Sequence, residues 1–184
     1  MRKSQFILVS RLKEKLQEFP EIVSSLEKKD HHFINKIMIW LKASEDILST
    51  YNISEVSEIA GFRSKILAAK MIEGRGTNIK KNQTKAAADA LYDIQNTILT
   101  VLAPFERKMN DCREIVKQLL VLTAQANTQI YDPTIPFEDF IRRVWLYILS
   151  ENDLKMGAIK LKSLLSEMDI LMLFGDEIEL SDFS

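Results

Sequence analysis

The sequence is poor in the residues that interrupt helices and in those that build reactive centres. Its 184 residues include one cysteine, two histidines, five glycines and four prolines. The single cysteine, Cys112, excludes a disulfide within the chain and a cysteine-rich zinc site, and it is typical of a reducing compartment. Because glycine and proline are scarce, we expect long helices with few interruptions.

Long apolar segments are also missing. No apolar run approaches the roughly 20 residues that a membrane-spanning helix needs. Near the start of the sequence, Arg11 and Lys13 interrupt the apolar stretch too early for a secretory signal peptide. With 46% hydrophobic and 28% charged residues, the composition is that of an ordinary globular protein. We therefore expect a soluble, cytoplasmic protein with no membrane partner.

The usual patterns of catalytic and cofactor sites are not found. His31 and His32 are adjacent, so on a helix their side chains point about 100° apart and do not readily share a metal ion. Cys112 falls on an apolar stripe and has no histidine near it in the sequence to act as a base. The glycines of Lys70–Lys85 lack the spacing and the Gly-Lys-Ser/Thr ending of a phosphate-binding loop. We predict no catalytic residue and no cofactor.

Two pairs of carboxylates have the spacing of metal ligands on one helix face. They are Glu55 with Glu58 and Asp89 with Asp93. In an antiparallel hairpin the pairs would be offset by about ten residues, or about 15 Å along the helix axis, which is too far for one ion. We therefore predict no metal site, and we keep a metal-dependent helical-bundle hydrolase as the second alternative function.

Apolar residues recur every three or four positions along most of the chain, which predicts an all-α fold. Helices are expected near residues 4–18, 30–51, 54–72 and 84–130, from 136 onward, and over 152–175, and residues 21–28 should form a short turn or a helix. Pro20 should end the first helix, and Asp30, Ser54 and Thr84 should cap later ones. The predicted architecture is a single bundle of five to seven mostly antiparallel helices, one of them long and kinked near Pro104.

The longest apolar stripe passes Pro104 with almost no loss of phase. Its steps of three and four form a heptad pattern with one extra step of four, which falls beside this proline. A proline inside a helix kinks or ends it. One long kinked helix and two helices separated at Pro104 are both consistent with the pattern, and the nearly continuous phase favours the first. We expect the stripe to be buried at Ile94, Ile98, Val101, Phe105, Met109, Cys112, Val116, Leu119, Thr123, Ala126 and Ile130.

The last third of the chain suggests the domain boundaries. Residues 131–136 include two prolines and form the clearest linker. The final helix is expected to end at Gly175. We predict one helical domain over 1–175, with a sub-boundary at 131–136, followed by an acidic-hydrophobic tail over 176–184. The expected buried stripe of the final helix is Leu154, Ala158, Leu161, Leu165, Met168 and Met172.

Charge is distributed unevenly along the chain. Residues 61–85 contain seven basic residues and one acidic residue, a balance of +6, whereas six acidic and no basic residues follow Lys162, a balance of −6. We hypothesise that these two ends attract each other, within one chain or between copies. The candidate contacts to an anionic partner are Arg63, Lys65, Lys70, Arg75, Lys80, Lys81 and Lys85, and the candidate docking residues of the tail are Ile178, Leu180 and Phe183.

These patterns favour an interaction protein over an enzyme. We predict a non-enzymatic protein–protein interaction or assembly protein that acts through helix faces and charged ends, and a homodimer is one such assembly. The first alternative is a helical protein that binds nucleic acid through the basic 61–85 segment, because clustered lysine and arginine suffice to neutralise phosphates. Salt-dependent binding to DNA or RNA would separate the two.

Overall fold

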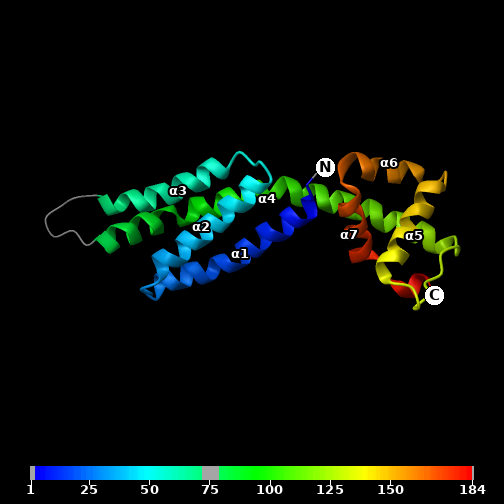
Figure 1. The fold of residues 1–184 in the computed structure, drawn as a ribbon, viewed down its shortest axis with the longest axis horizontal. Coiled ribbons are helices and arrows are strands. Elements are labelled where there is room, and N and C mark those ends of the chain that lie inside the picture. The colour runs from blue at the N-terminus through cyan, green and yellow to red at the C-terminus, as the bar shows by residue number, and fades with distance from the viewer. Residues whose placement is uncertain (1–2, 72–78, 184) are drawn as a thin grey trace. The chain divides into compact units, whose positions relative to one another are not determined.

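The computed structural model of the chain describes residues 3–71 and 79–183, with the backbone alone at residue 71, and over these residues the fold is all-α, as predicted (Figure 1). The described residues form seven α-helices and two short 3-10 helices and contain no strand. The elements are α1 (Gln5–Glu27), α2 (Phe33–Thr50), α3 (Val56–Ala68), η1 (Ala69–Met71), α4 (Ile79–Gln125), α5 (Phe137–Ser150), α6 (Lys155–Leu164), α7 (Glu167–Glu177) and η2 (Leu180–Phe183).

The helices belong to two compact units. Unit 2 comprises Ile7–Pro104, and unit 1 takes its described residues from Met1–Phe6 and Phe105–Ser184. The α1 and α4 helices therefore contribute residues to both units. A domain over 1–175 with a separate tail stays a prediction, because it concerns which residues fold independently.

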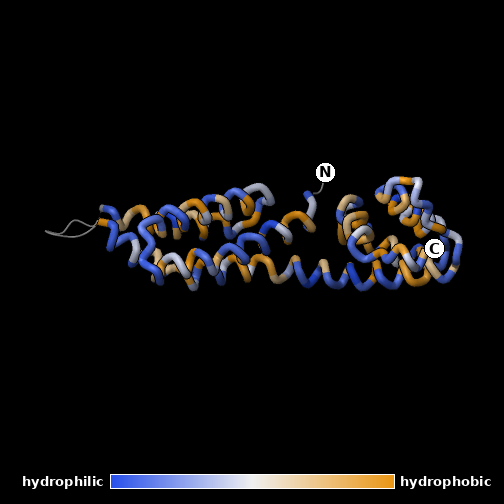
Figure 2. The backbone as a smooth tube through the Cα atoms, turned by 90° about the horizontal axis from the view of Figure 1, so that it is seen from below, coloured by the Kyte–Doolittle hydropathy of each residue, from blue (hydrophilic) through white to orange (hydrophobic). Residues whose placement is uncertain are grey.

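Unit 2 is built from α1, α2, α3 and the first part of α4. Side-chain contacts connect helices that follow one another in the sequence. The Trp40 indole of α2 donates to the Lys15 carbonyl of α1 at 2.9 Å, and its ring packs on Phe19 with centroids 5.2 Å apart. Gln83 of α4 donates to the Ile66 carbonyl of α3 at 3.3 Å. Orange and blue stretches alternate along the helices in Figure 2, and the orange stretches supply the apolar stripes of the core.

The first helix is longer than expected. Pro20 does not end it, because α1 continues to Glu27 with Pro20 on its exposed side. A proline removes one backbone hydrogen bond, whereas Phe19 and Ile22 on either side are buried in the core. Burying two such side chains contributes roughly 1.5–3 kcal/mol each. This packing accounts for the continuity of the helix.

None of the three predicted helix caps is found. Asp30 accepts the N–H of His32, the residue at the N-cap of α2, and pairs with Lys36 at 2.8 Å. Ser54 binds the Glu55 side chain instead of capping α3. Thr84 lies inside α4, where its hydroxyl donates to a carbonyl one turn back. All three polar side chains form hydrogen bonds with other groups nearby in the sequence, and such local hydrogen bonds compete with capping.

The long helix α4 is continuous through Pro104, which confirms the favoured interpretation over a break at this residue. Its apolar stripe is buried from Ile94 to Thr123, apart from the half-buried Phe105. The stripe ends earlier than predicted. Since α4 ends at Gln125 and Asn127 takes a left-handed backbone conformation (φ 49°), Ile130 leaves the helical phase and is 59% exposed.

The core of unit 1 combines α5, α6 and α7 with the second part of α4. The α5 helix begins one residue later than the expected start at 136, because Pro136 is its N-cap, and it has Glu138 and Asp139 in its first turn. Trp145 of α5 packs on Phe174 of α7, with ring centroids 5.5 Å apart. The α6 helix approaches α4 closely at Gly157, where a Cβ atom would lie 2.9 Å from a methyl carbon of Leu119.

The last predicted helix is in fact two helices. The α6 helix ends at Leu164, and Ser166 caps α7 by accepting the Asp169 N–H at 3.2 Å. The new start rotates the apolar phase, so Leu165 is buried but Met168 is 52% exposed. The expected stop at Gly175 is also wrong, because α7 continues through it to Glu177. Among the described helices, none combines the length and apolarity needed to cross a membrane.

Candidate binding groove

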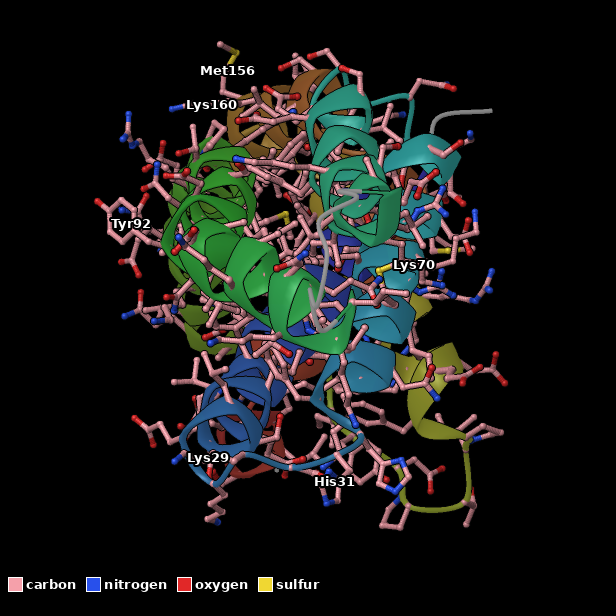
Figure 3. All side chains as sticks on the ribbon, turned by 90° about the vertical axis from the view of Figure 1, so that its left-hand side faces the viewer. Lys29, His31, Lys70, Tyr92, Met156 and Lys160 are labelled. Carbon is pink, nitrogen blue, oxygen red and sulfur yellow. The ribbon has the colours of Figure 1, made fainter. Side chains whose placement is uncertain are left out.

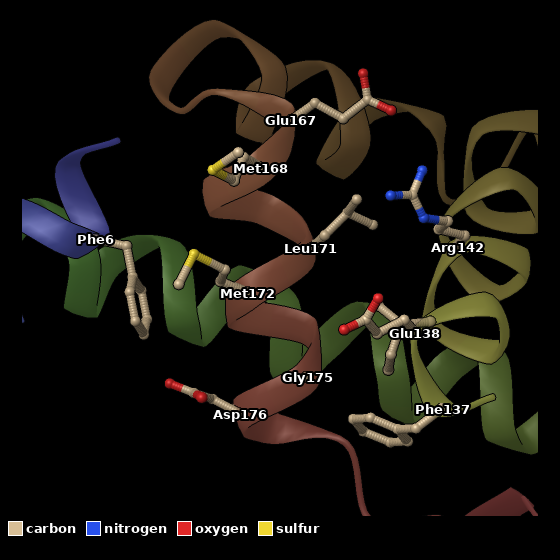
Figure 4. Close-up of a pocket in the computed structure, with 11 residues that line it drawn as sticks. Phe6, Phe137, Glu138, Arg142, Glu167, Met168, Leu171, Met172, Gly175 and Asp176 are labelled. Atoms are coloured by element: carbon tan, nitrogen blue, oxygen red, sulfur yellow. The ribbon is translucent and has the colours of Figure 1, made fainter. Parts of the chain in front are cut away.

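An open groove of about 830 Å³ lies in unit 1 along the outer side of α7. Figure 4 shows α7 between the first turn of α1, which supplies Phe6, and the first turns of α5, which supply Phe137, Glu138 and Arg142. The residues that line the groove are Phe6, Phe137, Glu138, Ile141, Arg142, Glu167, Met168, Leu171, Met172, Gly175 and Asp176.

The inner surface of the groove is mostly apolar. Leu171 and Met172 of α7 are half-buried, while Phe137 and Met168 stand at its edge with exposed fractions of 39% and 52%. Aromatic and unbranched thioether side chains present apolar area, and methionine adapts its shape to different partners. The surface therefore suits an apolar helix face better than a small polar ligand.

The rim of the groove carries an excess of negative charge. Three carboxylates, Glu138, Glu167 and Asp176, face one guanidinium, Arg142. Three negative charges and one positive charge give a rim balance of −2. Asp176 is also 3.8 Å from Arg113, which offsets part of its charge. The remaining excess favours a partner with positive charge beside its apolar face.

A buried carboxylate holds the first turn of α1 against α7. Asp169 is 0% exposed and accepts the backbone N–H groups of Gln5 and Phe6, each at 3.1 Å. The hydroxyls of Ser4 and Ser166 also donate to it, the latter at 2.8 Å. The first turn of α1 has no acidic residue of its own, so Asp169 supplies both the cap and the negative charge that favour a helix N-terminus. This network fixes Phe6 at the edge of the groove.

The other end of α7 is tied to α4 by ion pairs. Glu177 is paired with the Arg113 guanidinium and lies 3.7 Å from the Lys117 ammonium. The Glu177 side chain is 15% exposed, so this cluster is partly shielded from water. The helix that forms the centre of the groove is thus anchored at its start by Asp169 and at its end by Glu177.

The predicted basic segment, residues 61–85, belongs to unit 2, whereas the groove residues belong to unit 1. Arg63 is held by Glu45, with Nε and Oε2 2.8 Å apart, and Arg75 lies outside the described residues. The side chains of Lys65 on α3, Lys70 on η1 and, on α4, Lys80, Lys81 and Lys85 are exposed. A second hollow of about 610 Å³ touches this region and is lined by His31, His32, Ile34, Asn35, Ile79, Lys80 and Gln83.

The predicted docking residues of the tail pack onto their own unit. Phe183 is buried, with its ring edge-on to Phe140 at 5.6 Å, and its carbonyl accepts the Tyr131 N–H at 2.7 Å. Ile178 and Leu180 are half-buried. The attraction between the basic segment and the acidic end stays a prediction.

Over residues 3–71 and 79–183, no group of three or more histidine, cysteine or acidic side chains could hold a metal ion. Cys112 is buried, and burial raises the pKa of its thiol, which disfavours the nucleophilic thiolate.

Comparison of the chain with protein-family models, with curated proteins and with solved structures finds no match. The groove along α7 was not predicted from the sequence. Met168 and Met172 were expected in the core because they continue the apolar spacing of α6. The Ser166–Asp169 pair, a serine followed three residues later by an acid, was the available signal that a new helix begins.

Proposed function

We propose that this protein is a non-enzymatic protein–protein interaction protein whose groove along α7 binds an amphipathic helix. The observation that carries the proposal is the apolar surface of the exposed Met168 and the half-buried Leu171 and Met172, between aromatic side chains of α1 and α5. An amphipathic helix in an apolar groove is a recurrent mode of peptide recognition.

The charge on the rim defines the preferred partner further. Glu138 and Glu167 favour lysine or arginine beside the apolar face of the bound helix. Ion pairs at such an exposed rim contribute little affinity, about 0.2–1 kcal/mol each. They select the orientation and the sign of the partner, while the apolar contacts supply most of the binding free energy.

We propose that the protein acts in the cytoplasm and that its groove binds a protein partner with no membrane involved. The lone, buried Cys112 is compatible with a reducing environment. A nucleic-acid-binding role for the basic segment stays the alternative. Arg63 is paired with Glu45, whereas five lysine side chains of the segment are exposed.

The test measures binding of a fluorescently labelled amphipathic peptide made of leucine and lysine, by anisotropy. A scrambled peptide of the same composition is the first control. We expect the amphipathic peptide to bind more tightly than the scrambled one. Met168→Asp should weaken its binding about tenfold or more, because a negative charge replaces an exposed apolar contact of the groove. Leu146→Asp, at a position of α5 that is 65% exposed and outside the groove, should leave binding unchanged. Equal binding of both peptides, or equal effects of both substitutions, would contradict the proposal.

A further inference from the structure

A second surface of unit 1 has the chemistry that the groove requires of a partner. On α6, Met156 is 75% exposed and Ile159 is 52% exposed. Lys155 and Lys160 are exposed beside them, and Figure 3 shows Met156 and Lys160 projecting outward together. The pairs 155/159 and 156/160 are spaced by four, so the four side chains share one side of the helix. We call this set the α6 face.

The packing of α6 keeps this face on the outside. The opposite side of the helix is buried through Ala158 and Leu161. At Gly157 the helix lies so close to α4 that an added Cβ would meet Leu119 at 2.9 Å. Rotating α6 to bury Met156 would require larger side chains to enter this tight contact, which close-packed interiors resist.

The α6 face matches the groove in length and in charge. The α6 helix has 10 residues, and the groove follows α7 from Glu167 to Asp176, which is also ten residues. Both correspond to about 15 Å of helix. The two lysines of the face carry two positive charges, equal and opposite to the net charge of −2 at the rim of the groove. Its two apolar side chains fit the apolar inner surface of the groove.

We propose that the α6 face of one copy of this chain occupies the groove of a second copy. This inference rests on the proposed function, since it names the helix that the groove binds. Two copies can exchange both contacts in a closed dimer, or each copy can pass one contact to the next in an open chain. In either arrangement the contact joins a basic, apolar helix to an acidic, apolar groove.

The experiment measures the mass of the full chain by analytical ultracentrifugation over a wide concentration range. Two double variants reverse the charge of one surface each: Lys155→Glu with Lys160→Glu, and Glu138→Lys with Glu167→Lys. We expect the wild type to associate with increasing concentration, and each double variant to associate at least about tenfold more weakly. Mixing the two double variants should restore association, because the acidic groove of one then meets the basic face of the other.

The control is again Leu146→Asp, which should associate like the wild type. A wild type of constant single-chain mass, or a mixture that associates no better than its components, would overturn the inference. Rescue in the mixture also shows that both variants are folded. If the leucine-lysine peptide binds the groove while the wild type stays a monomer, the proposed function stands and this inference alone is wrong.

Discussion

The hollows of the two units differ in the side chains that line them. The hollow of unit 2 is lined by two histidines, a lysine, two amide side chains and two isoleucines, with no acidic residue among its described lining residues. The groove of unit 1 is lined by phenylalanine, methionine, leucine and isoleucine side chains, with three carboxylates and one arginine at its rim. Both units bury regular apolar stripes. The difference teaches that residues of the core type can line an open groove when a helix ends and the next one restarts in a new phase.

Helix length is the physical basis of this difference. In unit 2 the stripe of α2 runs through 18 residues, and Phe33, Ile37, Trp40, Ser44 and Ile47 are all buried. In unit 1, α6 has 10 residues and α7 has 11. The break between them rotates α7, so that Ile170, Leu173 and Phe174 enter the core while Met168 faces outward.

The largest effect we predict is a difference in the free energy of unfolding between a core variant and a groove variant of unit 1. Leu119→Ala should lower the free energy of unfolding by about 2–5 kcal/mol, because Leu119 is buried and packed against Gly157. Met168→Ala should change it by less than about 0.5 kcal/mol, the range of surface substitutions. Urea denaturation followed by circular dichroism measures both. Comparable losses for the two variants would mean that Met168 belongs to the core after all.

An intermediate effect is expected from the carboxylate beside the groove. Asp169→Asn replaces one acceptor oxygen by an NH2 group facing N–H or O–H donors, so at least one buried hydrogen bond is lost. We expect a loss of roughly 1–3 kcal/mol in the free energy of unfolding. Hydrogen exchange at the amides of Gln5 and Phe6 should become faster, while exchange at Trp40 in unit 2 should keep its rate.

The matched control for this variant is Asp176→Asn on the same helix. The side chain of Asp176 is 49% exposed, so its loss should affect stability much less. Unchanged exchange at Gln5 and Phe6 in Asp169→Asn would show that the buried carboxylate does not hold this turn.

The smallest effect compares one interhelix turn from each unit. The Lys36 ammonium and the His32 N–H lower the pKa of Asp30 to about 2, while the N–H and hydroxyl of Thr134 lower the pKa of Asp132. Salt screens the charged partner more than neutral donors. We therefore expect added salt to raise the pKa of Asp30 more than that of Asp132, as measured by NMR titration of the carboxyl carbons.

The sign of the linked stability follows from these pKa values. Both pKa values lie below that of an unfolded aspartic acid, about 3.9. The stabilisation is therefore fully present above this pH, and Asp30 loses its share as the pH falls toward about 2. Lys36→Gln should raise the pKa of Asp30 and leave that of Asp132 unchanged. Equal salt sensitivity of the two carboxyls would remove the contrast between the turns.

Periodic patterns predicted the fold class and most of the core. The stripe of α4 was visible because its phase persists across Pro104, and the start of α5 because the proline-containing linker over 131–136 precedes it. The groove could not be predicted in this way. Its residues come from three separate segments, at Phe6, near Phe137 and along α7, and no local pattern brings them together.

Local signals failed where tertiary contacts outweigh them. Pro20 lies beside buried side chains that keep α1 continuous. The cap of α1 is Asp169, more than 160 positions away in the sequence, and so it could not be recognised as a capping residue. Asp30 and Thr84 had the right chemistry for caps but bind other local partners.

The dependence of α1 on Asp169 has a consequence for the order of folding during synthesis. A sequence separation of 163 residues lies between Phe6 and the carboxylate that accepts its N–H. At a synthesis rate of about 5–20 residues per second, roughly 8–33 s pass between their additions to the growing chain. Throughout that interval the amides of Gln5 and Phe6 lack their final acceptor. The first turn of α1 is thus made well before the residue that completes its native hydrogen bonding.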